Sequence, residues 1–429
     1  MSKRISTDRI LRNEFLYRSW DTYSHMLRAK VILKERVDLS LLTKAVQKAK
    51  ERYPYFCKKV LRRGDDYEIV FNEAPAPVYE GSKGICLGSD EANGHFFSVC
   101  CKDRSIRVDL YHSMADMKGM MPFLTTVIYL YLKEKYGIAL SSEGIRVPGE
   151  DIPAAEYADP FEKLIITEDM LPLSRLKPVK NFFPDARYAK GPGRINCHLR
   201  ISESDLMRLV KSNDASPSVV IPYFLKETIN RLFPDRGGLP VACGISHSLR
   251  DVCAGEENNL DQVTMLSLRY DDRMDALPME TQLTCSRGQI ILQSDPQNML
   301  YDIKTKALFA NRLDSLKTAE ERRALYKNSP QQVINNPETF ASSYIGRINW
   351  GSTEPFIEDI FLSCSALVSP LMTVCVPVNG YFDICFIQRD NTDIYAKTFV
   401  SLLTQRDIKA EIVETEPEEI ATVTFPGPL

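Results

Sequence analysis

The most informative stretch of the sequence is Ser105-Ile-Arg-Val-Asp-Leu-Tyr-His112-Ser-Met-Ala-Asp116-Met-Lys-Gly119. Apolar and polar residues alternate up to the tyrosine, which is typical of a strand. His112 follows directly, and Asp116 comes four residues later. The apolar run from 120 to 136 then predicts a helix, with Gly137 placed to end it. The stretch therefore predicts a strand, a short loop and a helix, with His112 displayed where the strand ends.

Regular elements are predicted on both sides of this stretch. Before it, the patterns predict a strand at 29–34, a helix at 39–53 that Pro54 ends, and a hairpin at 56–71. Residues 95–102 pair with the strand of the opening stretch, whereas residues 8–18 form a mixed polar segment. Asn379-Gly380 predicts a further hairpin turn. Later strands are predicted at 194–201, 241–246, 361–367, 371–377 and 381–387, and later helices at 206–211, 218–232, 320–327 and 393–403.

A proline-rich connector divides the chain into two parts. Prolines recur from Pro148 to Pro192, and prolines at this density oppose long helices and central strands. We therefore expect a first domain at 1–175, a connector at 176–193 and a second domain at 194–429. Each part mixes antiparallel-looking strands with a few helices, which predicts two related α+β lobes in contact.

The composition excludes several classes of protein. The 429 residues include 54 basic and 57 acidic ones, a formal net charge of −3, so nucleic acid is not an expected partner. The sequence contains no run of 18 apolar residues, so we expect no membrane span. No apolar segment follows the N-terminal Met-Ser-Lys-Arg, so we expect no signal peptide. The eleven cysteines include no CxxC pair, which predicts reduced thiols in a cytoplasmic protein and no metal site.

The residue types around His112 suit proton transfer. A neutral imidazole can accept a proton at cellular pH, so His112 could deprotonate an alcohol or amine while that group attacks a carbonyl. Asp116 would hold the loop by pairing with an arginine, for which Arg250, Arg62 and Arg63 are candidates. Gly119 would allow a close approach of another backbone. The alternative is a loop histidine followed by an aspartate that only caps the next helix.

These segments resemble the HxxxD acyltransferase superfamily, which includes alcohol acetyltransferases, chloramphenicol acetyltransferases and nonribosomal peptide condensation domains. Residues 111–119 resemble its HHxxxDGxG motif, and residues 37–54 its early helix. Ser248-Leu-Arg250 resembles the NLR strand, Ser342-Ser-Tyr-Ile-Gly346 the SNxG segment, and 379–384 the closing hairpin. The chain departs from these motifs at Tyr111, Met117, Ser248 and Tyr344.

The resemblance implies a fold, a site and a reaction. The fold would be α+β, with two chloramphenicol-acetyltransferase-like lobes, mixed sheets flanked by helices, and a tunnel between the lobes. The reaction would be the direct transfer of an acyl group from acyl-CoA or an acyl carrier protein to an alcohol or amine. His112 would be the general base of this reaction. Ser342 or Ser343 would contact the oxyanion or substrate, and Arg250 is the implied partner of Asp116. The alternative is a non-catalytic member that binds an acyl ligand or a protein partner.

Two other chemistries are weaker interpretations of the same residues. Cys100 or Cys101 could act as a nucleophile with His112, but both lie within a predicted strand. A zinc site would need closely spaced cysteine and histidine ligands, which the sequence does not show.

Overall fold

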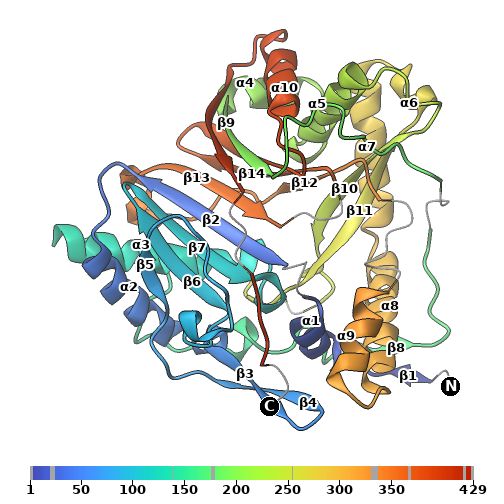
Figure 1. Ribbon diagram of the computed structural model, residues 1–429. Coiled ribbons are helices and arrows are strands. Elements are labelled where there is room, and N and C mark those ends of the chain that lie inside the picture. The colour runs from blue at the N-terminus through green and yellow to red at the C-terminus, as the bar shows by residue number, and fades with distance from the viewer. Residues whose placement is uncertain are drawn as a thin grey trace.

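We analysed a computed structural model, which describes residues 3–19, 25–137, 139–174, 179–253, 255–329, 337–365, 369–418 and 422–426. The chain forms two lobes, each built on a mixed β-sheet with helices against it (Figure 1). The buried apolar residues form two hydrophobic cores. The first is built mainly from the first lobe and also includes Val374, Val376, Val378, Cys385 and Ile387 of the second lobe's sheet. No helix within the described ranges is both long and apolar enough to cross a membrane.

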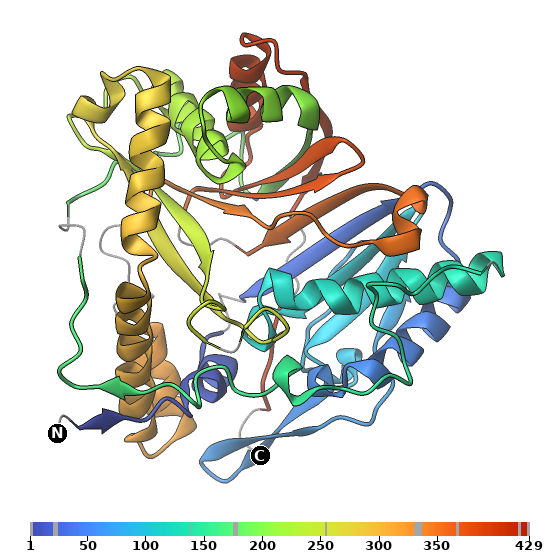
Figure 2. The same cartoon turned by 180° about the vertical axis from the view of Figure 1, so that it is seen from behind.

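The first lobe carries a five-stranded sheet in the order β13-β2-β7-β6-β5. Its strands are β2 Met26–Leu33, β5 Val78–Glu80, β6 Phe97–Lys102, β7 Ser105–Tyr111 and β13 Ile357–Cys364. Helices α2 (Leu39–Arg52) and α3 (Met117–Tyr136) lie side by side behind this sheet (Figure 2). A separate hairpin joins β3 (Lys58–Arg63) to β4 (Asp66–Phe71).

Local sequence explains where the two helices of the first lobe begin and end. The Asp38 side chain accepts a hydrogen bond from the amide of Leu41 and caps α2, and Asp116 caps α3 in the same way through Gly119. Gly137 ends α3 in the left-handed conformation, at φ 58°, which costs a glycine no steric strain. The apolar faces of both helices then pack into the first core.

The second lobe carries a seven-stranded sheet in the order β11-β10-β12-β14-β15-β9-β16. The β10–β12 and β12–β14 pairs are parallel, and the other pairs are antiparallel. The strands are β9 Ile195–Ser202, β10 Val241–Ser248, β11 Val263–Tyr270, β12 Phe340–Tyr344, β14 Leu371–Val378, β15 Tyr381–Gln388 and β16 Ala410–Pro417. The helices are α4 Glu203–Ser212, α5 Pro217–Leu232, α6 Asp272–Asp275, α7 Met279–Gln293 and α10 Ile394–Thr404.

Segments distant in sequence cross between the lobes. Strand β13 belongs to the second half of the chain but pairs with β2 of the first half, so an orange arrow lies beside a blue one in Figure 1. Near the other end, β1 (Arg4–Ile5) pairs with β8 (Ile166–Thr167) and packs into the second core. Helices α1 (Ile10–Tyr17), α8 (Pro296–Asp314) and α9 (Ala319–Lys327) lie against one another where the lobes meet. The boundaries at 175 and 194 stay a prediction, because neither lobe is one continuous stretch.

Most predicted elements are present, with ends that shift by a few residues. The short 3₁₀ helices are Pro54–Phe56, Asp90–Ala92, His112–Met114, Ala154–Glu156 and Gly351–Phe356. Residues 8–18, expected to be a mixed polar segment, contain helix α1. The strand predicted at 361–367 begins earlier, as β13, and its residues 366 and 367 lie outside the described ranges. Strands β11, β12 and β16 and helices α7 and α8 were not predicted.

Candidate active site

A cavity of about 260 Å³ lies where the end of β7 faces the second lobe. One wall comes from β2, β13 and the beginning of α3, and the other from β10, β11, β12 and β14 and the residues that follow β10 and β12. The residues that line it are Leu27, His112, Asp116, Met117, Lys118, Ser246, His247, Ser248, Arg250, Val263, Ser343, Tyr344, Ile345, Cys364, Met372 and Val374. Both lobes thus contribute to one cavity that contains the predicted base.

His112 follows the last residue of β7, and contacts of its backbone and its ring with His25 hold it there. Its amide donates a 2.8 Å hydrogen bond to the carbonyl of His25, and the following residues form a single 3₁₀ turn. The two imidazole rings stack, with centroids 4.1 Å apart and planes 7° from parallel. Burial, assisted by the nearby Arg18, lowers the pKa of His25 well below its usual value, so His25 stays neutral. Tyr111, at the position of the family's first histidine, instead packs in the first core.

Asp116 and Arg250 form a buried ion pair across the lobe interface. The guanidinium nitrogens Nη1 and Nη2 donate to Oδ2 and Oδ1 at 2.7 and 2.9 Å. Each side chain is 1% exposed. A two-point contact of this kind fixes distance and orientation together. Arg250 is therefore the arginine that pairs with Asp116, whereas Arg62 binds Glu320 and Arg63 binds Glu68.

Asp116 and Gly119 also touch the segment 258–262 of the second lobe. Oδ2 of Asp116 accepts a hydrogen bond from the amide of Gln262 at 3.0 Å. A Cβ on Gly119 would lie 2.1 Å from the carbonyl oxygen of Asn259, so only glycine allows this approach. The close backbone contact expected at Gly119 is present.

The structure separates the two serines proposed for the oxyanion or substrate. Ser343 lines the cavity, whereas Ser342 does not, and the hydroxyl of Thr373 donates to Ser342 Oγ at 3.0 Å. Met117, Ser248 and Tyr344, where the sequence departs from the family motifs, all line the cavity.

Cys100 and Cys101 lie away from His112. In the β6–β7 pair, Cys100 is opposite Arg107 and Cys101 opposite Ile106, so His112 is about 17 Å further along the strand direction. Burial raises the pKa of Cys100 to about 11, which keeps the thiol protonated at neutral pH. All eleven cysteines are free thiols. Cys100 or Cys101 as the nucleophile beside His112 is therefore wrong. Cys364 does line the cavity, but burial raises the pKa of its thiol to about 12.

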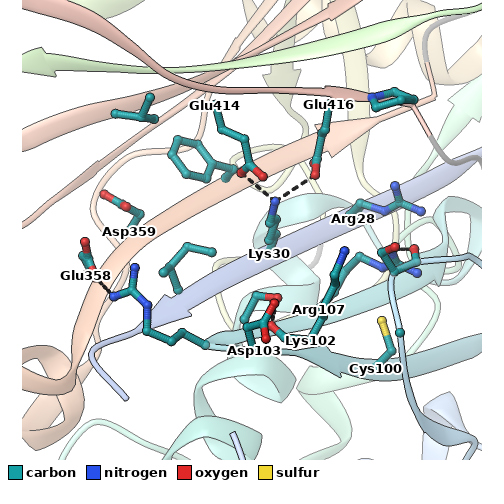
Figure 3. A pocket seen from close by; sticks show the side chains of 18 of the residues that line it. Arg28, Lys30, Cys100, Lys102, Asp103, Arg107, Glu358, Asp359, Glu414 and Glu416 are labelled. Atoms are coloured by element: carbon teal, nitrogen blue, oxygen red, sulfur yellow. Dashed lines mark hydrogen bonds and ion pairs between the residues drawn. The ribbon is translucent and has the colours of Figure 1, made fainter. Parts of the chain in front are cut away.

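A second, larger cavity of about 780 Å³ lies on the other face of the first sheet (Figure 3). Its charges satisfy one another across the lobes: Lys30 lies between Glu414 and Glu416, with nitrogen–oxygen distances of 2.8 and 2.9 Å (Figure 3). Within the described ranges, the group of side chains that could hold a metal is His198 with these two glutamates. Because Lys30 binds both carboxylates and His198 also binds Glu416, these groups already have partners, and this cavity is a weaker candidate for chemistry.

One acidic residue near His112 was not predicted. Asp261 is 5% exposed, and its Oδ2 lies 3.4 Å from Nδ1 of His112 and 3.2 Å from Nη1 of Arg18. It belongs to the polar run Asn258-Asn259-Leu-Asp261-Gln262, whose neighbours in space come from the other lobe. No spacing in the sequence relates it to His112.

The architecture is that of the chloramphenicol-acetyltransferase-like fold, with two lobes, mixed sheets and flanking helices. The expected α+β fold class is confirmed, whereas the tunnel between the lobes stays a prediction. The solved structures have the fold that the resemblance to the HxxxD acyltransferase superfamily implies, and at this low identity they show the fold alone. No family model and no curated protein matches the sequence itself.

Individual solved structures match nearly the whole chain. Polyketide synthase associated protein 5 from Mycobacterium tuberculosis is 14% identical, with a TM-score of 0.58 over 94% of this chain and 96% of that one. TRI101 of F. sporotrichioides, solved with coenzyme A and T-2, is 10% identical, with a TM-score of 0.58 over 96% and 100%. The condensation domain of the Monacolin K polyketide synthase MokA is 10% identical, with a TM-score of 0.56 over 94% and 96%.

Proposed function

We propose that the protein is an acyltransferase that moves an acyl group from a thioester to an alcohol or amine. The donor would be acyl-CoA or an acyl carrier protein, and the protein would act in the cytoplasm, as its cysteine pattern predicts. The observation that carries this proposal is the position of His112, at a strand end in a cavity that both lobes line. In this proposal the cavity would be the middle of a tunnel between the lobes. The thioester would enter from one side and the acceptor from the other.

The reaction would be a direct transfer with His112 as general base. Nε2 takes the proton of the acceptor hydroxyl or amine while the acceptor's oxygen or nitrogen bonds to the thioester carbonyl carbon. The tetrahedral intermediate then expels the thiolate, which takes the proton back from the imidazolium. The products are an ester or amide and a free thiol, and no side chain is acylated.

Ser343 is the proposed donor to the oxyanion. Its side chain lines the cavity opposite the β7 end, so its hydroxyl could stabilise the negative charge that develops on the carbonyl oxygen. Asp116 and Arg250 would hold the base without touching substrate, because each is buried against the other.

The proposal is tested by following free thiol release from acetyl-CoA with a panel of alcohols and amines. In the His112→Ala variant we expect turnover to fall by at least about 10²-fold, because general-base help is typically worth about 10²–10⁴. His198→Gln is the control, since that ring lies on β9 beside Glu416 in the other cavity, and it should stay within about twofold of the parent rate. Unchanged turnover in His112→Ala would refute the general-base role.

A non-catalytic role is the second candidate. Met117 and Tyr344 line the cavity at positions where the family motifs carry glycine and asparagine. If no donor and acceptor pair releases thiol while acyl-CoA still binds by calorimetry, the cavity holds a ligand without transforming it.

A further inference from the structure

The segment 258–262 is clamped by residues of the HxxxD region and its partner. Arg250 donates from Nε and Nη2 to the carbonyl of Asn258 at 3.2 and 3.0 Å, and from Nη2 to the carbonyl of Leu260 at 3.4 Å. Asp116 accepts from the amide of Gln262, and Gly119 leaves room for the carbonyl of Asn259. Three residues whose types the motif specifies thus converge on one short backbone stretch.

Side chains of the same segment make it rigid. Asn258 Oδ1 accepts hydrogen bonds from the amide of Leu260 at 3.0 Å and from Nε2 of Gln262 at 2.9 Å. Its Nδ2 donates to the carbonyls of Ala155 and Ala158 at 2.9 Å each. The residue between these anchors, Asp261, is therefore presented to His112 by a backbone with little freedom to move.

Among the described residues, Nδ1 of His112 and Oδ1 of Asp261 are buried without a hydrogen-bond partner, and the carboxylate oxygen Oδ2 of Asp261 lies 3.4 Å from Nδ1. Burial alone would raise the pKa of Asp261, but His112 and Arg18 beside it hold that pKa well below its usual value. Asp261 is therefore a carboxylate at neutral pH. Lys306 and the neutral His25 are the other titratable groups around this pair, and Glu14 lies 3.5 Å from Arg18.

We propose that Asp261 is the positioning residue of His112: its carboxylate accepts a hydrogen bond from Nδ1–H, which keeps the proton on Nδ1 and leaves the lone pair of Nε2 facing the cavity. This inference rests on the proposed function only for the role of Nε2 in the reaction. The tautomer itself is a property of the folded chain. The 3.4 Å separation is long for such a hydrogen bond and is expected to shorten when substrate excludes water.

Asp116, Gly119 and Arg250 would then have a second role besides holding the two lobes together. They would orient the base indirectly, by fixing the backbone that carries Asp261. His112 and Asp261 come from different lobes, so the base would be aligned only when the lobes are docked.

The first experiment reads the tautomer directly in the unaltered protein. Selective ¹⁵N-histidine labelling with long-range proton–nitrogen correlation distinguishes a protonated Nδ1 from a protonated Nε2, and loss of one signal set in His112→Gln assigns the ring. At neutral pH we expect the Nδ1-protonated form. A dominant Nε2-protonated form would overturn the proposal, and this result needs no activity and no further variant.

The second experiment compares three carboxylate variants. Asp261→Asn should mix the two tautomers and lower kcat by about 10²-fold with KM changed by less than about twofold. Asp261→Glu keeps the charge and should recover part of kcat. The control Asp359→Asn alters another buried carboxylate paired with an arginine, Arg200, and should leave the His112 tautomer and kcat unchanged.

The outcomes separate this inference from the proposed function. An Asp261→Asn protein with an unchanged tautomer and unchanged kcat would overturn the positioning role. A tautomer that depends on Asp261 in a protein that transfers no acyl group would support the positioning role and refute only the acyltransferase proposal.

Discussion

Asp116 caps helix α3 through the amide of Gly119 and also forms a two-point ion pair with Arg250. The two interpretations of this residue from sequence, a helix cap and an arginine partner, are both correct. Its carboxylate also accepts from the amide of Gln262, so one side chain joins a helix of the first lobe to two segments of the second. Removal of its charge leaves the buried Arg250 without a counter-ion.

Asp116→Asn should lower the free energy of unfolding by about 3–5 kcal/mol, because breaking a buried pair leaves an uncompensated charge. Urea denaturation measures the change. The matched control is Glu256→Gln, which removes the exposed partner of Lys118 and should cost less than about 1 kcal/mol. Unchanged stability combined with lost turnover would mean that Asp116 acts on the reaction itself.

At the scale of elements, the contact between α3 and the segment 258–262 depends on the absence of a side chain at Gly119. Gly119→Ala would place a Cβ 2.1 Å from a backbone oxygen of Asn259, and backbone atoms cannot move away as a flexible side chain can. We expect a loss of about 1–3 kcal/mol in the free energy of unfolding, the usual cost of overpacking.

The control for this substitution lies in another helix. Gly288, within α7, has no atom within 4 Å of an added Cβ, so Gly288→Ala should stabilise the protein by roughly 0.5–1 kcal/mol. Circular dichroism at increasing urea compares the two variants. Equal effects at both positions would show that the approach of Asn259 to α3 does not constrain Gly119.

Elements with strong local signals were predicted well. The Asn379-Gly380 turn takes positive φ at both residues, 48° and 79°, and joins β14 to β15 as the dipeptide predicts. Helices α7 and α8 were missed although Asp295-Pro296 is a readable start for α8. Strand β16 was not recognisable, because an edge strand with Glu411, Glu414 and Glu416 has the composition of a polar loop.

The sequence predicted those site residues that belong to the motifs resembling the acyltransferase superfamily. His112, Asp116, Gly119 and Arg250 follow from residue types and family spacing, and the structure brings them together. Asp261 could not be predicted, because its role depends on how the second lobe lies against the first. The distinction between Ser342 and Ser343 also required the structure, because the two residues are adjacent and of the same type, and only Ser343 lines the cavity.

At the scale of the whole molecule, ion pairs in the second cavity connect the two lobes, because Lys30 of the first lobe binds Glu414 and Glu416 of the second. Burial alone would raise the pKa of Glu416, but its hydrogen bonds to His198 and Lys30 hold that pKa at about 2. Glu416 titrates near 4.3 in an unfolded chain, so its ion pair contributes fully above about pH 5 and is lost as the pH falls towards 2.

Glu416→Gln should therefore remove part of the acid sensitivity of the protein. We expect a loss of about 1–2 kcal/mol in the free energy of unfolding at pH 6 and a smaller loss at pH 3. Denaturation at both pH values measures the difference. Glu68→Gln, which removes an exposed pair with Arg63 on one hairpin, is the control and should show little change at either pH. An equal loss at both pH values in Glu416→Gln would contradict the lowered pKa of Glu416.

The position of β13 has a consequence for how the protein is made. During synthesis, β2 emerges early, yet the strand that covers its edge is not translated until residues 357–364. Until then β2 presents a row of unpaired backbone amides and carbonyls, which other nascent chains can pair with. The first lobe thus cannot complete its sheet on the ribosome before most of the second has been translated. A chaperone that shields the edge of β2 would have to stay bound for most of the time that translation takes.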